Sequence, residues 1–341
     1  MSMKKYKGKP HIKGDKYKCF ILGEDTQTFG LGDKIDPDNP MPWSMIMKDV
    51  KGDNQNPNIS IQLFEKLVHY DASNNKCSFC GNKIVYKYFL EAMMKTRYKG
   101  GKTAQEIYEA DPMKVWERVC KIDRRKNQEP NGTDVFELNR AITFFKPSIA
   151  KHLCERFQAK AVLDPCAGWG GRMLGCVSAG CDYLGYDTNP DLVSCYNKMI
   201  VDLSGHWKWT SSCKGQMNWY SCLSGVNFTD NYGCPYEYNL VITSPPYENL
   251  EVYEGMNVFE NDEDYYENFL IPMIDKCRRW IEVGGHVCIN ISPKIYEKMT
   301  QTYHYEKAVD KIDFLQQMGQ KSGKKGDFIY VWKEIRPSVS V

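Results

Sequence analysis

Short apolar runs alternate with helix-like segments along the C-terminal part of the chain. The runs 161–163, 183–187, 239–242, 286–291 and 327–333 have the length and composition of buried strands. Between them lie segments with helical spacing, at 145–157, 173–178, 191–203 and 265–282. Strands that alternate with helices predict an α/β fold with a doubly wound, mainly parallel sheet.

The N-terminal part has a different pattern. Helical spacing is visible at 61–68 and from 85 to about 126, with a break at 99–101. Glu129-Pro130-Asn131-Gly132 is a strong turn signal and predicts a boundary. We therefore expect a flexible basic arm over 1–18, an α-rich accessory region over 19–132 and the α/β domain over 133–341.

Charge is distributed unevenly along the 341 residues, although the net charge is only +2. Residues 1–130 hold 24 basic and 17 acidic side chains, and seven of the first eighteen residues are lysines. Basic arms of this kind neutralise nucleic-acid phosphates, although a solvated tail has the same composition. Nucleic acid is therefore one candidate partner.

The fourteen cysteines are scattered through a long chain, which argues against a disulfide scaffold. No apolar stretch reaches the about 20 residues that span a bilayer, and the basic N-terminus precedes no signal-like apolar core. We expect an intracellular protein with reduced thiols that is not secreted.

Two of these cysteines, Cys77 and Cys80, stand two residues apart and precede a glycine. This spacing is typical of a zinc knuckle, in which both thiolates face one metal. A structural zinc needs four ligands, and the chain has no second Cys-x-x-Cys pair. His69, Cys19 and Cys120 are the candidate partners, and two unligated thiols in a turn are the alternative.

A glycine-rich turn follows the predicted strand 161–163, with the sequence Asp164-Pro165-Cys166-Ala167-Gly168-Trp169-Gly170. Glycines let the backbone approach a ligand closely, and the helix that follows offers amide donors at its N-terminus. Asp187 ends the next predicted strand, 23 residues after Asp164. Acids at about this spacing bind the ribose in nucleotide-binding folds.

Another polar loop follows the predicted strand 239–242, with the sequence Thr243-Ser244-Pro245-Pro246-Tyr247. The two prolines end the strand, because they cannot donate to a ladder and they fix φ. Open α/β folds bind their ligands at this carboxyl edge of the sheet.

In this order and spacing, the motifs resemble those of the S-adenosylmethionine-dependent DNA amino-methyltransferases, over about residues 140–335. The resemblance implies a class I methyltransferase fold, S-adenosylmethionine as cofactor and duplex DNA as partner, with a cognate restriction endonuclease as a further candidate partner. The cofactor-binding residues that it implies are Phe145, Lys146, Pro147, Asp164, Pro165, Ala167, Gly168, Gly170, Asp187 and Thr243. The catalytic residues that it implies are Ser244, Pro245, Pro246 and Tyr247.

The implied chemistry suits these residues. Ser244 Oγ and the Pro245 carbonyl can accept the two N–H bonds of an exocyclic amine and aim its lone pair at the methyl group. Tyr247 can stack on a base that is flipped out of the duplex. Methylation at cytosine C5 needs a Pro-Cys nucleophile in this loop, and the only Pro-Cys, Pro165-Cys166, lies in the glycine-rich turn. The serine favours cytosine N4 over adenine N6.

Some features depart from the family pattern and leave alternatives open. Arg172 stands where many relatives have a small hydroxyl residue, and no motif III acid is legible near 221–224. We expect any reading of DNA sequence to use residues before 130, the loop after Tyr247 and the segment 294–325. RNA or a protein glutamine is an alternative substrate, and an inactive DNA-binding module is an alternative function.

Overall fold

The computed structural model describes residues 57–73, 78–98, 101–111, 143–204, 237–248, 251–252, 258–313 and 327–335. These residues fall into two compact units. The larger unit holds residues 57–89 and the described residues from 143 onward, and the smaller holds the described residues between 90 and 111. The predicted boundaries at 18–19 and 132–133 lie outside the described residues and stay predictions.

A six-stranded sheet with the order β3-β2-β4-β6-β8-β7 forms the centre of the larger unit. Its first four strands in that order run parallel, whereas β8 is antiparallel to both of its neighbours. This confirms the mainly parallel α/β sheet predicted from the sequence. The strands are β2 (Ala161–Asp164), β3 (Asp182–Gly185), β4 (Leu240–Thr243), β6 (His286–Ile291), β7 (Asp310–Ile312) and β8 (Phe328–Lys333).

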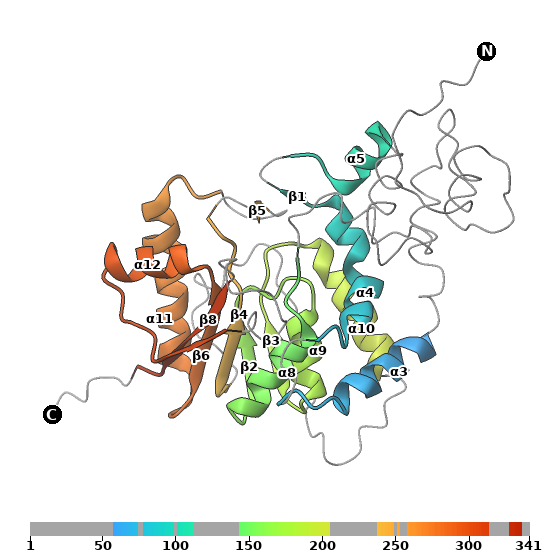
Figure 1. Ribbon diagram of the computed structural model, residues 1–341, viewed down its shortest axis with the longest axis horizontal. Coiled ribbons are helices and arrows are strands. Elements are labelled where there is room, and N and C mark those ends of the chain that lie inside the picture. The colour runs from blue at the N-terminus through green and yellow to red at the C-terminus, as the bar shows by residue number, and fades with distance from the viewer. Residues whose placement is uncertain are drawn as a thin grey trace, which may run out of the picture. The chain divides into compact units, whose positions relative to one another are not determined.

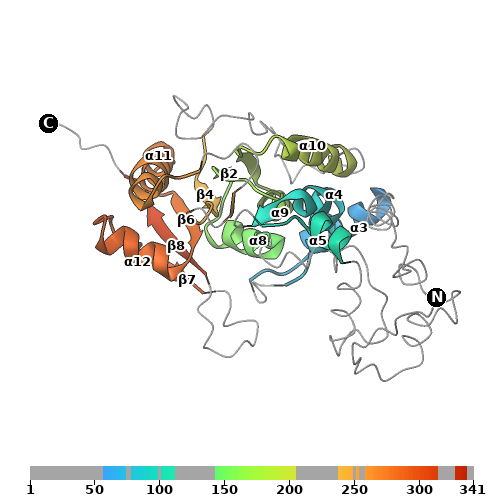
Figure 2. The same cartoon turned by 90° about the horizontal axis from the view of Figure 1, so that it is seen from above.

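Helices cover the sheet on both sides. In both views the strands β2, β4, β6 and β8 lie between α8 and α9 on one side and α11 and α12 on the other (Figure 1 and Figure 2). None of the described helices combines the length and the apolar character that crossing a membrane requires. The helices of this unit are α3 (Pro57–Val68), α8 (Pro147–Arg156), α9 (Gly171–Ser178), α10 (Asp191–Ser204), the π-helix η6 (Asp264–Leu270), α11 (Ile271–Trp280) and α12 (Pro293–Gln301).

The remaining elements are short, apart from α4 (Asn82–Lys95), which crosses the division between the units. They are β1 (Arg97–Tyr98), α5 (Ala104–Ala110) and β5 (Glu251–Val252). A capping box starts α5: the Glu106 N–H donates to Thr103 Oγ1 at 3.2 Å, and the Thr103 N–H donates to the Glu106 carboxylate at 2.9 Å. This box satisfies two backbone donors that the first turn leaves without helical partners.

The apolar residues of β4 are buried on both faces of the sheet, as expected of a strand with parallel neighbours. On one face, Val241 and Val287 belong to a buried cluster with residues of η6, α11 and α12. On the other face, Cys288 of β6 lies near Cys154 of α8, which in turn contacts Cys176 of α9. The core therefore fixes the strands from both sides, and the strands in turn fix the positions at which the loops begin.

The helix expected over 265–282 is in fact two pieces. Its first part is the π-helix η6, and the Ile271 N–H donates to the Tyr266 carbonyl five residues earlier. Pro272 follows at the start of α11 and has no N–H to continue a regular ladder. The proline explains the change of helical period, because an α-helix would require a donor at that position.

At Gly175 the helices α8 and α9 approach each other closely. A methyl group on Gly175 would overlap the Pro147 carbonyl and would come within 2.6 Å of Ala150 Cβ. Helix propensity favours alanine over glycine by about 1 kcal/mol. Overpacking costs about 1–3 kcal/mol.

We therefore expect Gly175→Ala to lower the free energy of unfolding, measured by urea denaturation, because the steric cost outweighs the propensity gain. The control is Asn197→Ala on the exposed side of α10, which should change stability by less than about 0.5 kcal/mol. A Gly175→Ala variant as stable as the parent would show that the steric cost is no larger than the gain in helix propensity.

Candidate functional site

The two loops singled out in the sequence leave the same edge of the sheet. Strands β2 and β4 are parallel neighbours, with Val162 opposite Leu240 and Leu163 opposite Val241. The chain continues from β2 to β3 on one side and pairs with β4 on the other, so this edge is a topological switch point. A hydrogen bond of 3.1 Å from the Cys166 N–H to Thr243 Oγ1 joins the loops directly.

The glycine-rich loop has a backbone shape that side chains would disturb. Gly168 and Gly170 have φ values of 57° and 72°, in the left-handed region that favours glycine. A Cβ on Gly170 would also lie 2.5 Å from the ring of Phe89. The loop therefore presents bare backbone at the switch point, as close contact with a ligand requires.

Tyr196 of α10 fixes the backbone of this loop through hydrogen bonds. Its hydroxyl lies 2.6 Å from the Gly168 carbonyl and 3.1 Å from the Ala167 carbonyl, and it accepts the Gly170 N–H at 2.9 Å. The side chain is completely buried. Sequence reasoning missed Tyr196, because its position on α10 looks like an ordinary core position.

Asp164 lies beneath the loop, with its carboxylate wholly buried. Arg172 Nε donates to its Oδ2 at 2.6 Å, and the hydroxyl of Tyr183 donates to the same oxygen at 2.6 Å. Arg172 also donates to the Cys166 carbonyl. The Cys166 N–H donates to the other oxygen of Asp164, Oδ1, at 3.3 Å. Contact of Asp164 with the cofactor, expected from the sequence, stays a prediction.

The same geometry explains why an arginine follows the glycines. Burial by itself lowers the pKa of Arg172, but the adjacent charge of Asp164 more than offsets this and the pKa is raised. The guanidinium therefore stays charged and compensates the buried carboxylate of Asp164.

Asp187 lies beside the glycine-rich loop, two residues beyond the end of β3. Its Oδ2 accepts the Gly168 N–H at 2.7 Å and its Oδ1 accepts the Asn189 N–H at 3.0 Å. Each carboxylate oxygen has a second lone pair. Burial raises the pKa of Asp187 above its ordinary value of 3.8.

The segment before α8 borders the same loop. The Arg172 guanidinium lies 5.4 Å from the centre of the Phe145 ring, and the Phe145 carbonyl faces Gly171. Lys146 stands at the N-terminal end of α8 without a side-chain capping bond, and its ammonium lies over the Phe79 ring. Pro147 is buried against Gly175. Phe145 is thus the member of this segment placed next to the predicted cofactor site.

Other predicted cofactor residues lie inside the loop. Pro165 and Ala167 are buried, and the Ala167 N–H donates to the Tyr186 carbonyl at 2.6 Å. The pKa of the Cys166 thiol is raised by burial and by the neighbouring carboxylates. A neutral thiol is a poor nucleophile. These positions shape the loop, and Cys166 lacks the ionisation that covalent attack would need.

The Ser-Pro-Pro-Tyr loop is held by two neighbouring elements. The hydroxyls of Ser244 and Tyr247 each donate to the main-chain carbonyl of Asn290 at 3.4 Å, and the side-chain Nδ2 of Asn290 donates back to Ser244 Oγ at 3.3 Å. The hydroxyl of Tyr265, in η6, donates to the Pro246 carbonyl at 2.9 Å. Sequence reasoning missed Asn290, which is hidden in the apolar run of β6.

The structure describes one of the two cysteines of the predicted zinc knuckle, Cys80. Cys77, Cys19 and Cys120 lie outside the described residues. Cys80 is a half-buried free thiol, and burial raises its pKa. Within the described ranges, no group of three or more His, Cys, Asp or Glu side chains could hold a metal. Zinc therefore stays a prediction. The segment 221–224, in which no motif III acid is legible, also lies outside the described residues.

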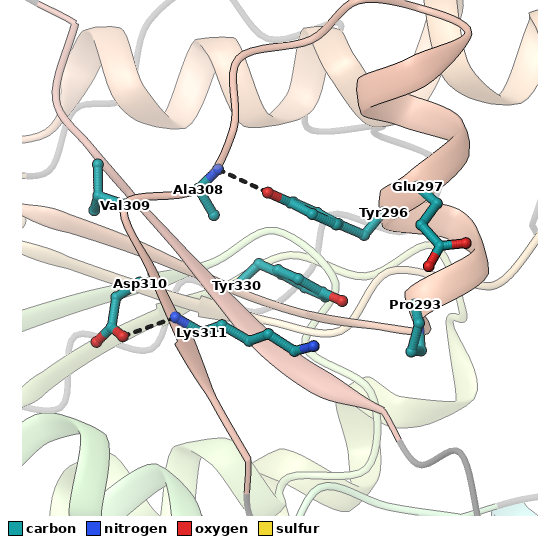
Figure 3. A pocket seen from close by; sticks show the side chains of 8 residues that line it. All are labelled: Pro293, Tyr296, Glu297, Ala308, Val309, Asp310, Lys311 and Tyr330. Carbon is teal, nitrogen blue, oxygen red and sulfur yellow. Dashed lines mark hydrogen bonds between the residues drawn. The ribbon is translucent and has the colours of Figure 1, made fainter.

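A separate hollow of about 520 Å³ lies between α12, β7 and β8, and Tyr296 stacks on Tyr330 in its wall at 3.8 Å between ring centres (Figure 3). None of the predicted site residues lines it. Its lining consists of Pro293, Tyr296, Glu297, Ala308, Val309, Asp310, Lys311 and Tyr330.

Removing the cation beneath the glycine-rich loop provides a direct test of its role. Arg172→Met leaves Asp164 buried without its counter-charge, which should destabilise the protein by about 3–5 kcal/mol. The matched control is Arg156→Met, which breaks an ion pair with Asp310 in which both side chains are over a third exposed; such pairs are worth about 0–1 kcal/mol. Equal losses in urea denaturation would contradict the assigned role of Arg172.

Comparisons with known proteins were made for the sequence and for the structure. Residues 238–335 match the family model described as DNA methylase, and a comparison with curated sequences found no match. A S-adenosylmethionine-dependent methyltransferase from Clostridium acetobutylicum aligns at 14% identity and a TM-score of 0.30, over 52% of this chain and 61% of its own.

TehB from Haemophilus influenzae aligns at 13% identity and a TM-score of 0.35, over 59% of this chain and 66% of its own. A TehB-like methyltransferase from Corynebacterium glutamicum aligns at 12% identity and a TM-score of 0.35, over 58% of this chain and 93% of its own. The chain thus spans less than two thirds of the length of the Clostridium methyltransferase and of Haemophilus TehB. The family match covers β4, the Ser-Pro-Pro-Tyr loop, β6 and β8, and it confirms the resemblance of this part of the chain to the DNA amino-methyltransferases.

Proposed function

We propose that this protein transfers a methyl group from S-adenosylmethionine to an exocyclic amino group of a base in duplex DNA. One observation carries the proposal. The Ser244–Tyr247 loop, within the segment that matches the DNA methylases, lies at the carboxyl end of β4 and is hydrogen-bonded through Thr243 to the glycine-rich loop after β2. A donor site and an acceptor site therefore share one edge of the sheet.

The residues around the glycine-rich loop suit the proposed cofactor. The backbone at Gly168 and Gly170 offers a surface without side chains, and Asp187 keeps lone pairs that can accept ribose hydroxyls. Phe145 adds an aromatic face at the other side of the loop. When bound, S-adenosylmethionine supplies a methyl group on a positively charged sulfur.

The acceptor loop suits an aromatic amine, which is a poor nucleophile because its lone pair is delocalised into the ring. Ser244 Oγ and the Pro245 carbonyl can accept its two N–H bonds and turn the lone pair out of the ring plane. Tyr247 can stack on the flipped base. Holding the nitrogen close to the methyl group provides most of the catalysis, since well-oriented reactants gain about 7–11 kcal/mol.

The choice of base follows from the resemblance alone. Serine before Pro-Pro-Tyr favours cytosine N4 over adenine N6, and we propose cytosine N4. The DNA methylase match favours DNA over RNA or a protein glutamine as substrate. A cognate restriction endonuclease stays a prediction.

The acceptor role of Ser244 is tested by Ser244→Ala. We expect methyl transfer to duplex DNA to fall by about 10²–10³, as when one preorganised group at a reacting centre is removed, with S-adenosylmethionine binding unchanged in calorimetry. The control is Ser194→Ala on the exposed side of α10, which should keep full activity. Full activity of Ser244→Ala would show that another group holds the amine.

The ribose-binding role of Asp187 predicts a pH dependence. Its carboxylate form is the better acceptor, and its pKa is raised by burial, so cofactor affinity should fall as the pH is lowered towards that pKa. The fall should start at a higher pH than for an ordinary aspartate.

Calorimetric titrations between about pH 4.5 and 7 test this prediction, a window that lies above the unperturbed aspartate pKa. Asp187→Asn should bind more weakly at neutral pH and should have a flat profile over this range. Asp191→Asn, at an exposed position, is the control and should behave as the parent does. If Asp187→Asn shows the same dependence of cofactor affinity on pH as the parent, Asp187 is not part of the cofactor site.

A further inference from the structure

We infer that Asn290 and Asp327 are positioning residues of the acceptor site, which fix the hydroxyl groups of Ser244 and Tyr247 for reaction. The inference rests on the proposed methyl transfer to an amine. It adds two residues that lie far from the Ser-Pro-Pro-Tyr motif in the sequence and that neither the motif nor its spacing indicates.

The sheet brings the two residues to the edge where β4 ends. Asn290 is the last but one residue of β6, whose parallel pairing sets Ile289 opposite Thr243. Asp327 directly precedes β8, which pairs with β6 in the antiparallel sense, so that Phe328 lies opposite Ile291. Because β8 is antiparallel, its beginning meets the ends of β4 and β6, and its first polar side chain reaches the acceptor loop.

Asn290 sets the direction of the Ser244 hydroxyl. A serine hydroxyl has one hydrogen and two lone pairs. In the structure its hydrogen is directed to the main-chain carbonyl of Asn290 at 3.4 Å, and one lone pair receives the Nδ2 hydrogen of the Asn290 side chain at 3.3 Å. The second lone pair is then the only group that this hydroxyl can offer to an amine N–H.

This polarity is the one that the reaction needs. If the Ser244 hydroxyl rotated and donated to the amine nitrogen, it would occupy the lone pair that attacks the methyl group. Distances of 3.3–3.4 Å are long for such bonds, and catalytic hydrogen bonds often shorten only when the substrate is bound. Asn290 therefore keeps Ser244 an acceptor before the base arrives.

Asp327 and Asn290 share the hydroxyl of Tyr247. This hydroxyl is 3.4 Å from the Asn290 carbonyl and hydrogen-bonds to the Asp327 carboxylate. Two acceptors for one hydrogen hold the end of the ring in place. A phenolic O–H prefers to lie in the plane of its ring, so the direction of this hydrogen also favours one ring plane. A ring whose plane is fixed loses less conformational freedom when a base stacks on it.

Neither side chain is required for the strand pairing itself. The ladder between β6 and β8 consists of backbone hydrogen bonds over six residue pairs. The acceptor loop has an additional anchor in the bond from Tyr265 to the Pro246 carbonyl. A change at Asn290 or Asp327 should therefore leave the loop in position and disturb only the two hydroxyls.

Two double-mutant cycles test the inference, with transfer of a radiolabelled methyl group to duplex DNA measured in single turnovers, so that slow variants are still quantified. Asn290→Ala should slow the step roughly tenfold to hundredfold in the parent and should add no further loss in Ser244→Ala. DNA binding is measured in the same assay as the DNA concentration that gives half-maximal transfer. Asp327→Asn should raise this concentration several-fold in the parent and should have no effect in Tyr247→Phe.

Three controls separate positioning from folding. Asn290→Asp keeps the side-chain shape but removes the donor, so it should be as slow as Asn290→Ala, and full activity would overturn the role of the amide. Asn268→Ala, on the exposed side of η6, should be as active as the parent. S-adenosylmethionine affinity should stay within about twofold in every variant, since the cofactor loop is unchanged.

The outcomes are distinguishable. Losses that are equal in the parent and in the Ser244→Ala or Tyr247→Phe background would overturn the inference while the methyl transfer stands. A parent protein that binds S-adenosylmethionine but transfers no methyl group to DNA would overturn the proposed function, and this inference with it.

Discussion

The parallel pairing of β2 with β4 is the constraint on which the rest of the site depends. It sets two chain segments that are about 80 residues apart in the sequence at one edge of the sheet, and buried side chains on both faces keep them there. The bond from the Cys166 N–H to Thr243 Oγ1 then ties the loops together at their first residues. The relative position of the predicted cofactor site and the predicted acceptor loop follows from this one strand register.

The buried carboxylate of Asp164 at the end of β2 imposes a second requirement, which is a compensating charge. An unpaired charge there would be strongly destabilising, and Arg172 and Tyr183 both bond to Asp164. Arg172 also bonds to the Cys166 carbonyl, so the group that neutralises the charge also fixes the loop. Stability and ligand geometry are therefore coupled at the base of the glycine-rich loop.

Much of this could be predicted from the sequence because it depends on local patterns. The apolar run before Ser244, the glycines of the first loop and the acid at 187 all have meanings that a few neighbouring residues determine. Tyr196 and Asn290 act through contacts with distant segments, so their positions in the sequence do not reveal them. Arg172 stands out in the sequence, but its pairing with the buried Asp164 is visible only in the structure. The three residues of β7 are too few for a periodic signal, and the π-helical turn depends on Pro272 within a pattern that otherwise fits an α-helix.

The central claim is that the loop at Ser244 directs a methyl group to an exocyclic nitrogen. The most direct measurement uses S-adenosylmethionine with an isotopically labelled methyl group and duplex DNA, followed by digestion to nucleosides and identification of the labelled product by mass spectrometry. The account predicts label in N4-methylcytosine, or in N6-methyladenine if the base assignment alone is wrong. Label only in 5-methylcytosine would contradict it, because carbon methylation requires a nucleophile that this loop does not contain.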